Sequence, residues 1–72
     1  MGEVVRLRFD SRLARFGCGM PQSIDGVGVV RCVRVDPWDT VVLAVFELEN
    51  GSKILASTPK GETSWRSVAT NQ

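Results

Sequence analysis

The segment 40–57, TVVLAVFELENGSKILAS, constrains the fold of this chain more than any other. It holds two apolar, β-branched runs separated by Asn50-Gly51, and the first run predicts a strand over Val41–Leu48. This dipeptide between such runs is the strongest local signal for a β-hairpin. A type I′ turn needs φ > 0 at both central residues, which Asn and Gly tolerate. With Asn50 and Gly51 as the two loop residues, the predicted register pairs Leu48 with Lys53, Phe46 with Leu55, and Val45 with Ala56.

The length and composition indicate one small globular domain spanning residues 1–72. A chain of 72 residues has a thin core, and oligomerisation is a common source of stability at this size. Apolar residues make up 43% and charged residues 24%, which fits a folded protein. The sequence has no apolar run near the ~20 residues of a membrane helix, and its start lacks the pattern of a signal peptide. We therefore expect a cytoplasmic protein without membrane contact.

Cys18 and Cys32 are the only cysteines, and the chain has no histidine. In an intracellular chain we expect both thiols to be reduced, with Cys32 packed in a strand as a small hydrophobic residue; a disulfide is the alternative. Two cysteines without histidine fall short of a four-ligand zinc site, so we expect no metal and no other cofactor. Because histidine is the commonest catalytic acid or base, the sequence also predicts a protein that is not an enzyme.

The residues before position 29 predict a strand, a helical turn and a loop. Val4–Phe9 alternates apolar residues with Arg6 and Arg8, the pattern of a half-buried strand with a basic outer face. Asp10 or Ser11 can cap one helical turn over 11–16, closed by Gly17. Residues 17–28 hold four glycines and one proline and predict a long loop. This loop is either a binding surface or, through Met20 and Ile24, a plug that closes one end of the core.

The remaining segments predict further strands. Val27–Val35 has apolar residues on both faces, which indicates a central or sharply bent strand, with Val29, Val33 and Val35 sharing one face. The segment 36–39 predicts a type I turn with proline in its second position, and 63–69 a last short strand anchored by Trp65. Four to five short antiparallel strands and no long helix predict an all-β fold, closed into a small barrel that removes exposed edges.

Two resemblances support this barrel. Gly26-Val27-Gly28-Val29-Val30 opens a strand, and Val45-Phe46-Glu47 leads into a tight hairpin and a strand with Trp65. Over residues 26–68 this order resembles SH3-like small barrels of the Tudor and KOW kind, which implies that fold. The segments 45–51 and 54–56 are also similar to the hairpin of one-domain OB-fold translation initiation factors. The basic run that follows in those factors is absent here, where 57–62 reads STPKGE, and this argues against RNA binding by that route.

Charge is uneven along a chain of net charge +1. Residues 1–34 hold six arginines and three acidic residues, a balance of +3, while residues 35–72 hold three basic and five acidic residues, a balance of −2. On neighbouring strands, the arginines at positions 6, 8, 31 and 34 could follow a phosphate backbone, with a tryptophan as a stacking platform. The competing interpretation is a solvated face balanced by Glu47 and Glu49, which the low net charge favours.

Trp38 lies in the turn between Asp36 and Asp39, whereas Trp65 is expected in the core. An exposed tryptophan is typical of a protein-binding hot spot, and an exposed strand edge can accept a partner's strand. Alternatively, Trp38 folds back over one end of the barrel. We expect a non-catalytic adaptor or regulatory module that recognises another protein or associates with itself; the alternative is a small nucleic-acid-binding barrel. The candidate binding residues are Trp38, Arg6, Arg8, Arg31 and Arg34.

Overall fold

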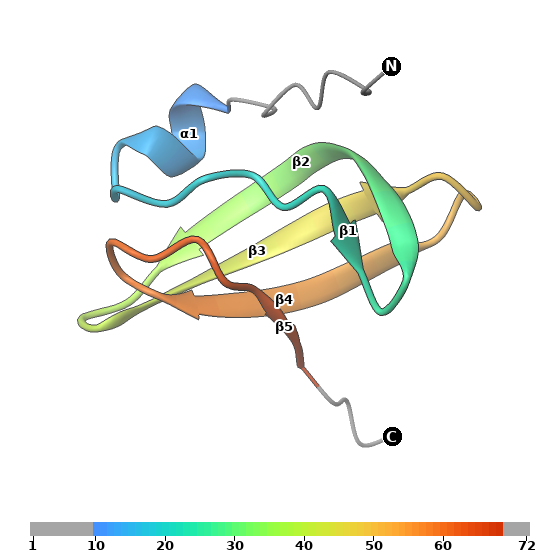
Figure 1. The fold of residues 1–72 in the computed structure, drawn as a ribbon. Helices are drawn as coiled ribbons and strands as arrows, with labels where there is room; N and C mark the ends of the chain where they lie inside the picture. Colours follow the sequence, from blue (N-terminus) through green and yellow to red (C-terminus); the bar gives the residue numbers. More distant parts are fainter. Residues whose placement is uncertain (1–9, 69–72) are drawn as a thin grey trace, which may run out of the picture.

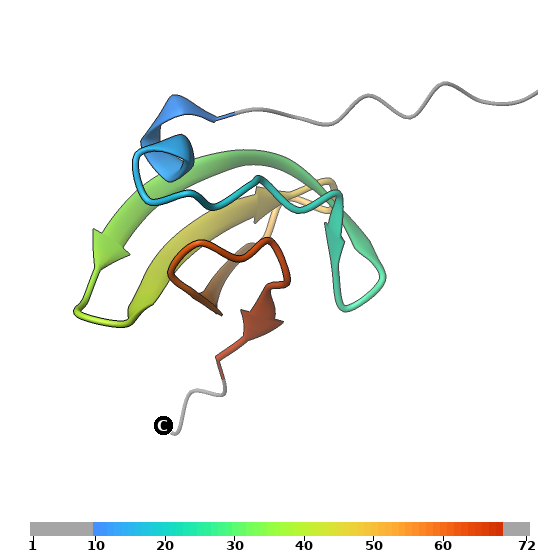
Figure 2. The same ribbon diagram turned by 60° about the vertical axis from the view of Figure 1, so that its left-hand side comes forward.

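The computed structural model describes residues 10–68. Within these residues the chain forms one short helix, α1 (Ser11–Ala14), and five strands: β1 (Ser23–Ile24), β2 (Val27–Pro37), β3 (Val41–Leu48), β4 (Lys53–Pro59) and β5 (Arg66–Ser67). The strands lie in the sheet in chain order, and each pairs antiparallel with the next (Figure 1). The sheet curls into a nearly closed barrel, as the turned view in Figure 2 shows. The all-β prediction is confirmed; the predicted strand Val4–Phe9, with Arg6 and Arg8, lies outside the described residues.

β3 supplies the centre of the core. Its residues are alternately buried and partly exposed, and Val42, Ala44, Phe46 and Leu48 form the buried series. Phe46 has no exposed surface, and its ring meets Trp65 edge-on, with centroids 5.0 Å apart. Such aromatic pairs add to the stabilisation that burial alone provides. The predicted bounds of this strand and the core position of Trp65 are confirmed.

α1 is the predicted helical turn, and it closes one side of the core. The carboxylate of Asp10 accepts a hydrogen bond from the backbone N–H of Arg12 at 2.9 Å, so Asp10 is the N-cap. Leu13 is completely buried. Gly17 ends the turn with a φ of 73°, a left-handed conformation that glycine adopts without steric cost.

The β3–β4 hairpin forms as predicted, but its register is one residue away from the predicted one. Phe46 pairs with Ile54 and Val45 with Leu55, because the loop has three residues instead of two. The backbone N–H of Leu48 donates to the carbonyl of Ser52 at 2.8 Å, and residues 49–51 lie between them. In the described chain Gly51 has positive φ but Asn50 does not. The turn is therefore a type I turn followed by a left-handed glycine.

Asn50 has a different role from the one predicted. Its side-chain oxygen accepts a hydrogen bond from the backbone N–H of Ser52 at 3.0 Å, the local bond that makes Asn common in turns. Because side chains alternate between faces, the one-residue shift places Ile54 and Ala56 beside the core and turns Leu55 to the outside.

The type I′ geometry occurs instead at Asp25-Gly26. Both residues have positive φ, 53° and 80°, and Ile24 pairs with Val27 across this two-residue loop. Asp-Gly is one of the sequences that this turn favours. The prediction of a continuous loop over 17–28 is therefore wrong in its last part, which forms β1 and the start of β2. Met20 and Ile24 are buried, which confirms that this segment plugs the core.

Two β-bulges bend β2. Val29 pairs with Leu48 and Arg31 with Glu47, and the ladder is interrupted again between Cys32 and Arg34. Val30 and Val33 are the extra residues, and they are 46% and 37% exposed. Bulges increase the local bend and twist of a strand, so the prediction of a sharply bent strand is confirmed. The prediction that Val33 shares a face with Val29 is wrong, because each bulge resets the alternation.

The β2–β3 turn also lies later than predicted. Pro37 still pairs with Val42, and the backbone N–H of Trp38 donates to the carbonyl of Val41 at 2.8 Å. Residues 39 and 40 therefore form the tip of the turn.

Candidate functional site

Three rows of side chains run across the outer face of the sheet, pointing away from the core. The pairings of β2, β3 and β4 define these rows as Arg31, Glu47 and Lys53; Arg34, Val45 and Leu55; and Asp36, Leu43 and Ser57. We call this surface the outer face. Its first row is charged on all three strands, whereas the other two rows combine a charged residue on β2 with aliphatic residues on β3 and, at Leu55, on β4.

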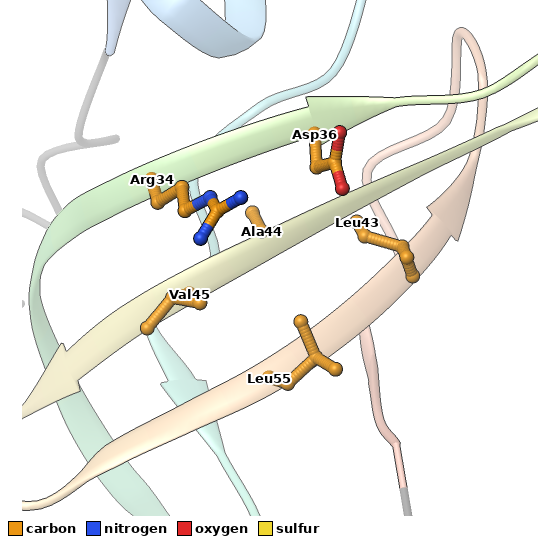
Figure 3. Close-up of a pocket in the computed structure, with 6 residues that line it drawn as sticks. All are labelled: Arg34, Asp36, Leu43, Ala44, Val45 and Leu55. Atoms are coloured by element: carbon orange, nitrogen blue, oxygen red, sulfur yellow. The ribbon is translucent and has the colours of Figure 1, made fainter.

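A hollow of about 320 Å³ lies in the outer face, and we call it the outer hollow. Figure 3 shows Arg34 and Asp36 on β2 along one side of it, with aliphatic side chains across from them on β3 and β4. Leu43, Val45 and Leu55 are half-buried. Apolar side chains of this size at the surface offer area that a partner can remove from water, a favourable contribution to binding.

The charges on the outer face differ in how they are compensated. The Nε of Arg31 lies 2.8 Å from an oxygen of Glu47, so this arginine is held in an ion pair. Arg34 and Asp36 are exposed, and neither forms an ion pair with any residue between positions 10 and 68. The outer hollow is therefore bordered by one cation and one anion, neither of which the described residues hold in an ion pair.

The structure brings together part of the predicted site. Arg31 and Arg34 both project from β2 onto the outer face. Trp38 lies at the β2–β3 turn and is 58% exposed, so it does not fold back over the barrel. Arg6 and Arg8 cannot be placed, since they precede the described residues.

Sequence reasoning missed Asp36, Leu43, Val45 and Leu55 as members of this surface. For Leu55 the missing information is the hairpin register. The predicted register places Leu55 opposite Phe46 and therefore on the core side, whereas the observed register places it opposite Val45 on the outer face.

α1 protects the edge of β2 that faces away from β3. The guanidinium of Arg12 donates to the carbonyl oxygens of Val33, at 3.2 Å, and of Cys32. It also forms an ion pair of 2.8 Å with Asp10, and this hydrogen bond lowers the pKa of the Asp10 carboxyl. Further along the same edge, Pro37 has no N–H to offer. Covering an edge and placing proline on it both oppose strand addition, so this edge is a poor acceptor for a partner's strand.

The thiols are inaccessible in the folded protein. Cys18 and Cys32 are free and buried, as predicted for Cys32, and burial raises the pKa of the Cys32 thiol. A thiol in this state is a poor nucleophile and a poor metal ligand at neutral pH. Over positions 10–68 there is no cluster of three or more cysteines and carboxylates that could hold a metal ion. The same stretch has no helix long and apolar enough to cross a membrane.

Comparison of this chain with models of protein families, with curated proteins and with solved structures finds no match.

Proposed function

We propose that this chain is a small, non-catalytic module of the SH3-like barrel kind that binds another protein through its outer face. The observation that carries this proposal is the outer hollow, in which three half-buried aliphatic side chains are bordered by Arg34 and Asp36, neither of which forms an ion pair within residues 10–68. An apolar centre with a polar rim is the anatomy of a protein–protein contact.

Trp38 extends the proposed contact surface. It follows Asp36 by two residues and is 58% exposed. Tryptophan buries a large area on binding at a low entropic cost, and it is enriched among the residues that dominate binding energy. We therefore include Trp38 in the proposed contact surface.

Nucleic-acid binding is the alternative, and the charges of the outer face argue against it. A surface that follows a phosphate backbone needs several cations without compensating anions. Here Arg31 is paired with Glu47, and Asp36 lies two residues from Arg34 on the same strand. The remaining candidates for this role, Arg6 and Arg8, precede the described part of the chain.

The test is capture of protein partners, with a tagged second copy of the chain among the proteins offered, by the immobilised full chain, compared with two lysine variants. Leu55→Lys places a charge inside the outer hollow, while Val30→Lys places the same charge on an exposed valine of a β2 bulge. We expect proteins retained by the wild type to be retained by Val30→Lys and lost by Leu55→Lys, with circular dichroism confirming that both variants fold. Equal retention by all three proteins would refute the proposal, as would capture of nucleic acid that weakens steeply with salt.

A further inference from the structure

We infer that the partner that fits the outer hollow is a second copy of this chain, packed face to face about a twofold axis. This inference rests on the proposed function and names its partner. In a twofold contact the same patch is used by both copies, so the patch must be complementary to itself. The outer hollow has this property in its two charges and in the two aliphatic residues of β3.

The arrangement of two neighbouring rows specifies the contact. Arg34 pairs with Val45 in one row, and Asp36 pairs with Leu43 in the next. The twofold axis lies in the interface, runs across the strands and passes between these two rows. Rotation about it places each row of one copy over the other row of its partner. Arg34 then meets Asp36 of the second copy, and Val45 meets Leu43 of the second copy, each contact occurring twice. The two sheets pack nearly aligned, a common geometry for sheets in face-to-face contact.

Charge complementarity favours a second copy over a different partner. The outer hollow carries one positive and one negative side chain, and neither has an ion-pair partner within residues 10–68. A strongly acidic or strongly basic partner would leave one of these two charges facing a like charge. A second copy in the twofold arrangement neutralises both of them at once.

The size of the chain gives a second reason. A domain of this size buries only about 60% of the surface that its unfolded chain exposes, so its stability is marginal. Covering the aliphatic residues of the outer hollow with an identical surface adds apolar burial without any further component, a common route to stability for small domains.

Charge reversal tests this contact. Sedimentation equilibrium on the full chain is measured for the wild type, for Arg34→Asp, for Asp36→Arg and for the variant with both changes. Each single change opposes like charges across the twofold axis, so we expect its dimer dissociation constant to rise about tenfold or more, the change that about 1.4 kcal/mol produces. The double change exchanges the two charges and restores the wild-type constant. Mixing the two single variants yields a heterodimer, since Arg34→Asp carries two anions in the outer hollow and Asp36→Arg carries two cations.

Arg15→Asp is the matched control, because it makes the same charge change on an exposed residue of the segment that follows α1. We expect it to leave the dimer constant unchanged, and circular dichroism of every variant excludes unfolding as the cause of a loss. A wild-type chain that stays monomeric at millimolar concentration overturns the inference, as does a dimer that the single reversals do not weaken. If the wild type is monomeric while Leu55→Lys still abolishes protein capture, the proposed function stands and only the identity of the partner is wrong.

Discussion

The indole Nε1 of Trp65 donates a hydrogen bond of 2.7 Å to the carbonyl oxygen of Gly19, which lies 46 positions earlier in the chain. This bond joins the segment that follows α1 to the segment that leads into β5, on the side where the sheet is not closed by strand pairing (Figure 2). The outermost strands, β1 and β5, have only two residues each. The side chain of Trp65 therefore helps to close the barrel, together with the backbone hydrogen bond of 3.0 Å from the N–H of Gly61 to the carbonyl of Phe16.

Removing the indole donor should destabilise the fold. Trp65→Phe keeps an aromatic ring near Phe46 but leaves the carbonyl of Gly19 without this partner, and we expect the free energy of unfolding to fall by about 1–3 kcal/mol. Urea denaturation followed by circular dichroism measures the change. Trp38→Phe is the control, and as an exposed substitution it should stay within about 0.5 kcal/mol of the wild type. Equal stability of the two variants would contradict this role of Trp65.

The same two variants test the exposure of Trp38 by fluorescence. In Trp65→Phe the emission comes only from Trp38, which is 58% exposed, so the folded protein should emit at the long wavelength of a hydrated indole and be quenched readily by acrylamide. In Trp38→Phe the emission comes from the half-buried Trp65, and it should shift to shorter wavelength and resist quenching. The measurement is made at a concentration where the chain is monomeric, and a Trp38 shielded from acrylamide there would argue against its place in a contact surface.

The sequence predicted the elements of this fold better than their register. β3 follows from the apolar, β-branched run that precedes Asn50-Gly51, and its bounds Val41–Leu48 are those predicted. The loop length at Asn50-Gly51 does not follow, because this dipeptide suits both a two-residue type I′ turn and a three-residue turn ending in a left-handed glycine. Apolar residues on both faces of β2 indicate a central or bent strand but not where the bulges lie, since the extra residues Val30 and Val33 do not differ in type from the valines that face the core.

The candidate site depends on the length of the β3–β4 loop and on the two bulges of β2, which could not be predicted from the sequence. The turn signals place Trp38 in a connection between strands, but they leave open whether it is exposed or folded back over the barrel. Strict alternation would put Arg31 and Arg34 on opposite faces, and the bulge between Cys32 and Arg34 is what brings both to the outer face. The outward position of Leu55 requires the correct loop length, because a shift of one residue exchanges the two faces of a strand. The pairing of Arg34 with Val45 likewise requires knowledge of both bulges.

Gly17 should tolerate alanine less well than Gly51 does. Both residues have left-handed φ values, 73° and 88°, which cost an L-residue roughly 1–2 kcal/mol. A Cβ at Gly17 would also lie 3.2 Å from the Cα of Gly61, whereas a Cβ at Gly51 would meet nothing within 4 Å. We expect thermal denaturation to show a larger loss of stability for Gly17→Ala than for Gly51→Ala. The reverse order would show that the contact between the segments around Gly17 and Gly61 is looser than described.

The ion pair at the start of α1 should make stability depend on pH in the acid range. The hydrogen bond from Arg12 lowers the pKa of Asp10 in the folded state, so its stabilising effect is fully present above the ordinary carboxyl pKa of about 4 and is lost as pH falls through the folded value. Asp10→Asn keeps an N-capping oxygen but removes the charge. The difference in unfolding free energy between wild type and Asp10→Asn should therefore be largest near neutral pH and shrink below about pH 4. A difference that stays constant with pH would exclude the charge as its source.

Amide NMR spectra of the labelled full chain, recorded over a dilution series, test most directly whether the outer face is a protein-contact surface. Self-association through the outer hollow predicts shifts that depend on protein concentration and cluster at Arg34, Leu43, Val45 and Leu55, while α1 and β1 remain unchanged. Adding mixed-sequence single-stranded RNA at physiological salt should then move none of these signals. A spectrum that does not respond to dilution but shifts around Arg31 and Arg34 with RNA, in a salt-sensitive way, would contradict protein contact and make the barrel a nucleic-acid binder.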